Sequence, residues 1–234
     1  NNAQTSHDGG TETNYNLKHA LEVKAAAVAL RRYVESKKDP TLFRKTNRMV
    51  LGVGEREVGV LLKRFEEFRE HYPDLRLVGK DELRQIEPKV MEGRDANEEV
   101  CALVSSEGYA INYQRLAEYF LEDALENAKR SGRNFGAFFN VKVKSIKREG
   151  ALYLVETNDY TVATPVIVFA AGPYSLLFAQ QLGYGKDLGI LSVAGSFYSG
   201  GEFLQGKVYR VQIEGMPFAA IHGDPDVLNA KDTR

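Results

Sequence analysis

The sequence predicts a mixed α/β fold, because its hydrophobic residues follow helical spacing in some segments and strand spacing in others. Residues 17–36 and 112–132 carry apolar residues at the helical period, whereas residues 141–147 and 152–157 alternate between polar and apolar. Residues 166–169 form a short continuous apolar run, which suits a strand buried on both faces. The 234 residues, 43% hydrophobic and 27% charged, are enough for one or two folded domains.

The first half of the chain is predicted to alternate helices with strands. Thr13 and Asn14 can cap the first helix, and Tyr72-Pro73 stops the second. Asp81 can cap a short helical turn. The expected elements are a helix at 17–36, a strand at 48–53, a helix around 58–68, a helical turn at 81–87 and an apolar strand around Cys101.

The second half is predicted to contain a strand meander between two helices. Asn112 can cap the first of these helices, and Gly132 closes it just after Lys129 and Arg130, which favour a helix C-terminus. The expected elements after it are strands at 141–147, 152–157 and 166–169, a helix from Pro173 to about Gly183, and strands around 191–198, 207–213 and 217–221.

Charge and cysteine content restrict the class of partner and the compartment. With 31 Lys and Arg against 32 Asp and Glu, the chain has no excess of positive charge to bind a nucleic-acid backbone, so no nucleic acid is expected. The single Cys101 lies in an apolar run and is expected to be a buried, inert thiol in a reduced compartment. No His pair or Cys-His spacing indicates a metal.

Two glycine turns are candidates for binding a phosphate group. Gly52-Val53-Gly54 follows a strand and opens a helix, but the third glycine of a dinucleotide fingerprint is replaced by Glu57, so a plain glycine bend is expected there. Ala171-Gly172 ends an apolar strand before a helix and lets a ligand approach the backbone closely. A tight turn without a ligand explains this second motif equally well.

Two histidines lie in polar, glycine-flanked loops and are candidates for acid–base chemistry. His7 is followed by Asp8 and two glycines, and His222 comes at the end of an apolar strand where the chain must turn. A histidine in such a place can act as a general base at neutral pH, although loop histidines are more often solvated. His19 and His71 are expected on the surface of amphipathic helices.

A series of short motifs runs in order along nearly the whole chain. It comprises NAQTSHDG (2–9), ETNY (12–15), MVLGVGE (49–55), IEPKV (86–90), GR (93–94), SSEGYA (105–110), VFAAG (168–172), SLLFAQ (175–180), VAGSFY (193–198), GKVY (206–209), VQ (211–212), PFAA (217–220) and HGDPD (222–226). This series resembles the malate:quinone oxidoreductases. An ordered match of this extent is far more specific than any one motif.

The resemblance implies an FAD/NAD(P)-binding-like domain interleaved with a mixed-sheet substrate domain. Residues 1–39 with 110–185 would form part of the flavin domain, and residues 40–109 with 186–234 the substrate domain. The family's N-terminal strand, glycine-rich turn and helix would lie before Asn1, and a segment that closes over the flavin would follow Arg234. The chain is therefore expected to be an internal fragment that, by itself, is inactive and holds no FAD.

The resemblance also implies roles for particular residues. Oxidation of a 2-hydroxy acid requires a base for the hydroxyl proton, a hydride acceptor and cations for the carboxylates. The implied residues are His222 as the base, Arg234 as a carboxylate ligand, Ser6, His7 and Gly9 near the flavin ring, Val143 at the adenine end of FAD, and Ala171 and Gly172 at its ribose and phosphates.

The function that the resemblance implies is FAD-dependent oxidation of L-malate to oxaloacetate, with electrons passed to a quinone. The enzyme would be cytoplasmic and peripheral on the inner face of the cell membrane. One alternative is a related flavoenzyme that oxidises 2-hydroxyglutarate or an amino acid. An alternative of another class is a non-catalytic folded remnant or binding module.

Overall fold

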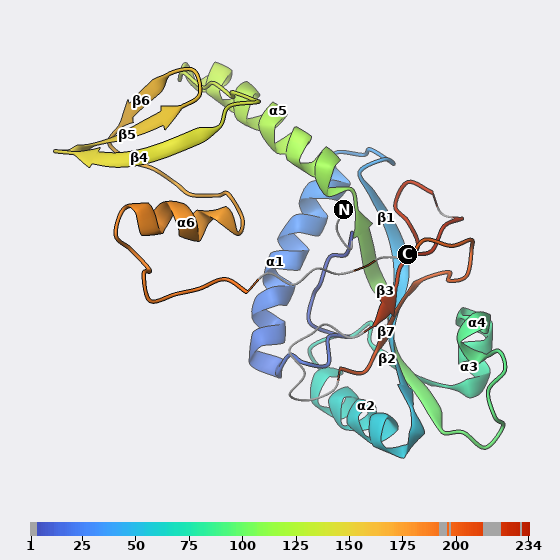
Figure 1. Ribbon diagram of the computed structural model, residues 1–234. Coiled ribbons are helices and arrows are strands. Elements are labelled where there is room, and N and C mark those ends of the chain that lie inside the picture. Colours follow the sequence, from blue (N-terminus) through green and yellow to red (C-terminus); the bar gives the residue numbers. More distant parts are fainter. Residues whose placement is uncertain (1–3, 192–195, 197, 213–220, 230) are drawn as a thin grey trace. The chain divides into compact units, whose positions relative to one another are not determined.

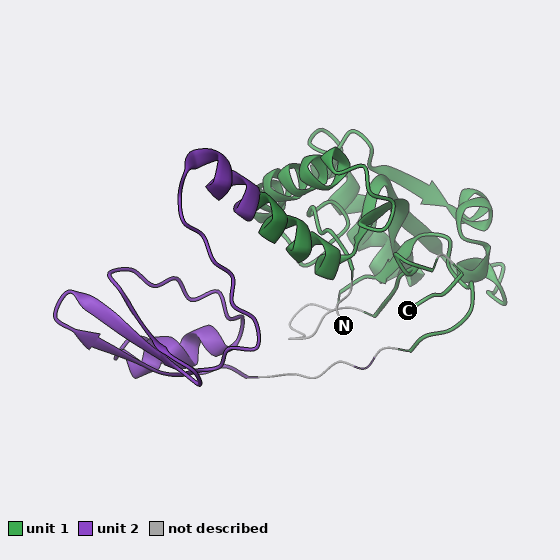
Figure 2. Ribbon diagram, turned by 90° about the horizontal axis from the view of Figure 1, so that it is seen from above, with its two compact units in different colours: residues 1–123, 197–234 green, residues 124–196 purple. Residues whose placement is uncertain are grey.

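The computed structural model describes residues 4–191, 196, 198–212, 221–229 and 231–234. The chain divides into two compact units (Figure 2). We call residues 1–123 with 197–234 the sheet unit, and residues 124–196 the meander unit. Each unit is described by itself.

A five-stranded mixed sheet forms the centre of the sheet unit (Figure 1). In spatial order its strands are β2 Arg76–Gly79, β3 Val100–Ile111, β1 Phe43–Val53, β7 Lys207–Arg210 and β8 His222–Gly223. β1 runs antiparallel to β3 and parallel to β7, whereas β7 and β8 are antiparallel. The β7/β8 register places Tyr209 directly opposite His222, so both side chains lie on one face of the sheet.

Helices cover both faces of this sheet. Because successive side chains of a strand point to opposite faces, each apolar strand contributes to two separate clusters. One cluster involves α1 Leu17–Ser36 and α2 Gly54–Phe68 and includes Ala20, Val50, Leu61, Phe68, Leu103 and Tyr209. The other involves α3 Lys80–Ile86 and α4 Pro88–Met91 and includes Met49, Leu51, Leu83, Met91, Ala102 and Val208. The predicted mixed α/β fold is therefore confirmed.

The long helices agree with the sequence pattern, and their caps differ in part. α1 has the predicted bounds, but its cap is Asn16, whose Oδ1 accepts a hydrogen bond from the His19 amide at 2.9 Å, and not Thr13 or Asn14. α5 Tyr113–Ser131 follows the predicted cap Asn112. α3 begins at Lys80 without a side-chain cap, so the predicted capping role of Asp81 is wrong.

The glycine bend expected at Gly52-Val53-Gly54 is confirmed. A Cβ on Gly52 would lie 2.9 Å from the Leu61 side chain and 3.1 Å from the Glu57 carbonyl oxygen, so the close approach of β1 to α2 disfavours any larger residue. Gly54 opens α2 with a φ of +79°. Glu57 Oε2 accepts the Val53 amide at 2.9 Å, so this carboxylate serves the helix start.

The meander unit contains a three-stranded antiparallel sheet and one helix (Figure 1). Its elements are β4 Val143–Glu149, β5 Leu152–Thr157, β6 Thr161–Thr164 and α6 Tyr174–Gln181. The prediction of a buried strand at 166–169 is wrong, since these residues form no strand and Val166 and Val168 are 70% and 83% exposed. Burial on both faces requires neighbouring strands, and the described strands of this unit pair among themselves.

The C-terminal strands agree with prediction only at β7. β7 is shorter than the predicted 207–213, and residues 213–220 lie outside the described residues. The strand predicted at 217–221 falls there except for Ile221, and most of the strand predicted around 191–198 lies outside the described residues as well.

Candidate functional site

The N-terminal segment, residues 4–16, lies against the five-stranded sheet and carries three of the predicted site residues. The Ser6 amide donates to the Tyr109 carbonyl at 3.0 Å, and Thr5 bridges to Ala110 of β3. Arg64 of α2 donates to three carbonyls of the segment, those of Gly9, Gly10 and Tyr15. Backbone hydrogen bonds to a strand and bonds from the Arg64 side chain of a helix thus fix the segment that carries His7.

Buried charges hold this segment in place. Asp8 pairs with Arg31 of α1 at 2.5 Å and with Arg48 of β1, and Arg48 is only 1% exposed. The buried carboxylate of Glu12 lies 3.9 Å from the Arg48 guanidinium. Buried ions are tolerated when they are paired in this way, and removal of one partner is costly. The segment is therefore locked to the sheet by a network of opposite charges.

Three rings form a row on one face of the sheet, which we call the histidine row: His7, Tyr209 and His222. The ring centroids of His7 and Tyr209 are 6.2 Å apart, and those of Tyr209 and His222 are 5.4 Å apart. The Tyr209 hydroxyl lies 3.5 Å from His7 Nδ1. The structure thus brings the two candidate histidines, 215 residues apart in sequence, to either side of one tyrosine.

Carboxylates adjoin both histidines of the row. Glu12 Oε1 lies 2.9 Å from His7 Nδ1, and Asp224 Oδ2 lies 3.5 Å from His222 Nε2. Burial alone would raise the pKa of Glu12, but the hydrogen bond with His7 and the charge of Arg48 outweigh burial and lower that pKa to about 2. Glu12 is therefore an anion at neutral pH.

Tyr209 is a neutral phenol across the working pH range. Burial is the main cause that raises its pKa well above 10, and the negative charges of Glu12 and Asp224 add to this effect. Tyr209 can therefore donate a hydrogen bond and separate the two rings, but it does not supply a base.

His222 and Arg234, the predicted base and carboxylate ligand, line the same open groove. The groove has a volume of about 540 Å³, and its lining also includes Arg210. Arg234 pairs with Asp226 at 2.5 Å, and Arg210 pairs with Glu57 at 2.9 Å. A guanidinium has five N–H donors, so each arginine keeps donors beyond those engaged by its carboxylate.

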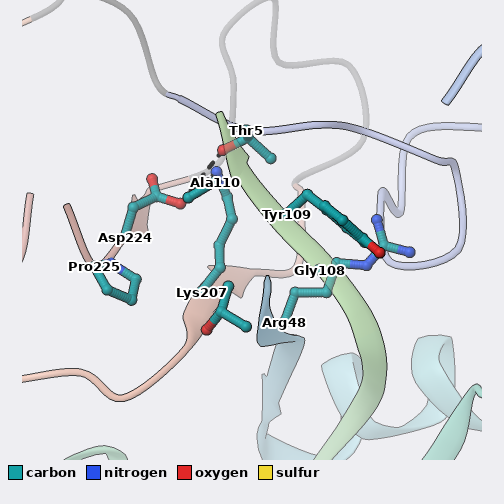
Figure 3. Close-up of a pocket in the computed structure, with 9 residues that line it drawn as sticks. Thr5, Arg48, Gly108, Tyr109, Ala110, Lys207, Asp224 and Pro225 are labelled. Atoms are coloured by element: carbon teal, nitrogen blue, oxygen red, sulfur yellow. Dashed lines mark hydrogen bonds and ion pairs between the residues drawn. The ribbon is translucent and has the colours of Figure 1, made fainter. Parts of the chain in front are cut away.

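A small internal cavity lies beside Asp224 (Figure 3). Its volume is about 10 Å³, room for one water molecule, and Arg48, Lys207 and Tyr109 line it. Lys207 pairs with Asp224 Oδ1 at 2.5 Å, and burial lowers the pKa of Lys207 against the effect of that carboxylate. Thr5 also donates to Asp224, so Asp224 links the N-terminal segment to β7.

The remaining predicted residues have local roles that can be stated. Gly9 has a φ of +87°, and a Cβ there would lie 2.6 Å from the Ala20 backbone, so packing on α1 already requires glycine. Ser6 is buried, and its hydroxyl has no hydrogen-bond partner among the described residues. In the meander unit, Val143 begins β4, and Gly172 has a φ of +56° with open space where a Cβ would lie.

Sequence reasoning missed Glu12, Tyr209 and Arg210. Glu12 follows His7 by five residues in a loop, a spacing without a helical or strand period that would predict contact. Tyr209 looked like one more strand residue, and its role depends on the β7/β8 register, which joins segments distant in sequence.

Comparison with known proteins places these features in a family. A family model described as FAD dependent oxidoreductase (DAO) matches residues 2–210. A malate:quinone oxidoreductase of Helicobacter pylori (strain ATCC 700392 / 26695) is 38% identical over the whole chain, and a probable malate:quinone oxidoreductase of Campylobacter jejuni is 34% identical. The chain spans about half of each relative, 52% and 53% of their lengths.

Solved structures agree with this assignment at the level of the fold. L-proline dehydrogenase from P. horikoshii superimposes with a TM-score of 0.60 at 16% identity, over 85% of this chain and 51% of that one. Glycine oxidase from Geobacillus kaustophilus gives a TM-score of 0.60 at 14% identity, over 98% of this chain and 60% of that one. The predicted FAD-binding-like fold, the predicted resemblance and FAD as the family's cofactor are confirmed. The chain belongs to the DAO family of FAD-dependent oxidoreductases.

Proposed function

We propose that this chain is part of an enzyme that oxidises L-malate to oxaloacetate with FAD and passes the electrons to a quinone. The observation that carries the proposal is the identity of 38% over the whole chain to a malate:quinone oxidoreductase. The geometry is consistent with it, because a histidine and two arginines line one groove. A dicarboxylic 2-hydroxy acid needs one base and cations for two carboxylates.

The residues of the groove divide the chemistry between them. We assign to His222 the removal of the hydroxyl proton, since it begins strand β8 and is held by the β7/β8 pairing. Arg234 would bind a carboxylate of the substrate with the donors that Asp226 leaves available. When bound, FAD supplies the acceptor for the hydride that leaves the carbon bearing that hydroxyl group.

The residues predicted to hold FAD fit such a ligand in three respects. Ser6 offers a buried hydroxyl without a partner among the described residues, and half-exposed His7 adjoins it in the same segment. Gly172 leaves its backbone open to close approach, and α6, which follows it, packs on β4. We therefore assign Ser6, His7 and Gly9 to the flavin ring, Val143 to the adenine end, and Ala171 and Gly172 to the ribose and phosphates.

The two predicted domains follow from these roles. Residues 1–39 and 110–185 would contribute to the flavin domain, and residues 40–109 and 186–234 to the substrate domain. This division concerns which ligand each segment binds, whereas the sheet and meander units describe how the chain packs. The assignment is supported by strands β7 and β8, which carry Tyr209 and His222 of the histidine row in the proposed substrate domain, whereas His7 lies in the proposed flavin domain.

Quinone reduction implies contact with a membrane, and we propose peripheral attachment to the inner face of the cell membrane. Among the helices of the described residues, none has the length and apolar character needed to cross a bilayer. Attachment from one side would bring a lipid-soluble acceptor to the flavin.

A steady-state assay with a soluble quinone tests the proposed function. The whole protein loaded with FAD should reduce the quinone when given L-malate, without a nicotinamide cofactor. Turnover with 2-hydroxyglutarate or an amino acid in place of L-malate would favour the related flavoenzyme. A protein that binds FAD but turns over none of these compounds would favour a non-catalytic module.

A further inference from the structure

Glu12 is placed to orient the ring of His7. The Glu12 carboxylate is buried and lies 2.9 Å from His7 Nδ1, while the His7 side chain keeps 44% of its surface exposed. We propose that Glu12 is a positioning residue that fixes neutral His7 as the Nδ1–H tautomer, with Nε2 left as a proton acceptor. His7 is thereby a second acid–base group in addition to His222, and this acid–base role rests on the proposed function.

The tautomer follows from the hydrogen-bonding capacity of the pair. An ionised carboxylate only accepts hydrogen bonds, so the Nδ1 atom that contacts Glu12 must carry the proton. In a neutral imidazole the lone pair then lies on Nε2. This is the arrangement by which a buried carboxylate orients a catalytic histidine on unrelated folds.

The surroundings of the pair maintain the charge of Glu12. The Arg48 guanidinium lies 3.9 Å from the Glu12 carboxylate and offsets its charge, and Arg48 is itself anchored by Asp8. Tyr209 faces His7 from β7, and its phenol stays neutral. Arg48 keeps Glu12 charged, and Tyr209 brings no charge to His7. Glu12 is therefore the charged group that sets the position of the His7 proton.

His222 is held differently, so the two histidines are not equivalent. Its Nε2 atom lies 3.5 Å from Asp224, and the same carboxylate pairs with Lys207 at 2.5 Å. His7 has the shorter contact to a carboxylate. The two rings also direct different nitrogens to their carboxylates, Nδ1 in His7 and Nε2 in His222.

Nitrogen-15 NMR of the full chain tests the tautomer without any activity measurement. At a pH where His7 is neutral, its two ring nitrogens should show the Nδ1–H pattern in the wild type. Glu12→Gln should shift His7 toward a mixture of tautomers, because an amide can donate or accept. Glu22→Gln is the matched control, because the exposed Glu22 lies 3.5 Å from Nδ1 of His19 and should leave His7 unchanged.

The wild-type spectrum decides the tautomer of His7 even where Glu12→Gln fails to fold. An Nε2–H pattern for His7 would overturn the proposed tautomer.

The acid–base role of His7 is tested by flavin reduction with L-malate, measured in the whole protein loaded with FAD. His7→Gln should lower the limiting rate roughly 100-fold and Glu12→Gln roughly tenfold or more, with little change in the malate concentration at half-saturation.

Glu12→Asp should recover part of the rate that Glu12→Gln loses, since the shorter carboxylate still accepts from Nδ1. Wild-type limiting rates in both His7→Gln and Glu12→Gln would overturn the acid–base role of His7. If L-malate fails to reduce the flavin of the wild type, the proposed function fails. The tautomer of His7 is still decided by NMR in that case.

Discussion

Asp8 is the residue on which the attachment of the N-terminal segment most depends. It pairs with Arg31 and with the fully buried Arg48, so its loss removes the nearest anion of two buried cations. We predict that Asp8→Asn lowers the free energy of unfolding by about 3–5 kcal/mol, measured by urea denaturation. Glu82→Gln breaks an exposed pair with Arg76 and should cost under about 1 kcal/mol. Equal losses in the two variants would contradict this account.

Glu12 makes the stability of the fold depend on pH in a defined window. Its pKa is lowered from 4.5 to about 2 in the folded state, so its contribution is complete above about pH 4.5 and is lost as pH falls toward 2. The shift corresponds to about 3 kcal/mol at neutral pH. The difference in unfolding free energy between wild type and Glu12→Gln should fall by more than half between pH 7 and pH 3. A difference that stays constant over this range would contradict the lowered pKa.

His222 carries the proposed base function, and its replacement should slow only the half-reaction in which L-malate reduces the flavin. His222→Gln should retain the fold and bound FAD in the whole protein but slow flavin reduction by L-malate by roughly 10²- to 10⁴-fold. Reoxidation by quinone should be unchanged, because no hydroxyl proton is removed in that step. His19→Gln, on the exposed face of α1, is the control. Stopped-flow reduction of His222→Gln at the wild-type rate would assign the base to another residue.

At the scale of elements, the N-terminal segment packs so closely on α1 that one position accepts only glycine. Gly9 combines a φ of +87° with a contact of 2.6 Å between a would-be Cβ and the Ala20 backbone. We predict that Gly9→Ala costs about 3 kcal/mol of stability from overpacking and strain. Gly93→Ala, with a φ of +72° and open space, should cost about 1 kcal/mol. Equal thermal shifts in the two variants would show that the packing on α1 does not matter.

Helices could be predicted from the sequence because their signals are local. α1 and α5 carry apolar stripes with capping and closing residues nearby, and their bounds agree with the prediction. β1 begins five residues earlier than predicted. Its first part is polar, and a register shift between Thr46 and Arg48 interrupts the alternation on which the prediction depended. The apolar run 166–169 has the composition of a buried strand, but burial depends on neighbours that composition does not reveal.

The candidate site was predictable only in part, for a similar reason. His7 and His222 could be identified as candidates from the glycines beside them in the sequence, and the resemblance to a family gave each of them a role. Their meeting across Tyr209 depends on the pairing of β7 with β8, a contact set by tertiary structure. The Glu12 contact to His7 depends on a loop conformation fixed by Arg64 and Asp8, and no periodic pattern encodes it.

At the scale of the whole molecule, family membership and site geometry lead to one account. The chain has the fold of FAD-dependent oxidoreductases and spans about half the length of its curated relatives. Within it, the sheet unit brings two histidines, a neutral tyrosine and two arginines to one region of the five-stranded sheet. Among them are one histidine and two arginines in a single groove, the base and the cations that the proposed oxidation of a dicarboxylic 2-hydroxy acid requires.

Anaerobic reduction of the bound flavin tests this account most directly. The whole protein loaded with FAD is mixed with L-malate in a stopped-flow instrument, with no quinone and no nicotinamide cofactor present. We predict that the absorbance of oxidised flavin near 450 nm is lost in a single turnover with L-malate. Flavin that stays oxidised with L-malate and is bleached by 2-hydroxyglutarate or an amino acid would contradict it.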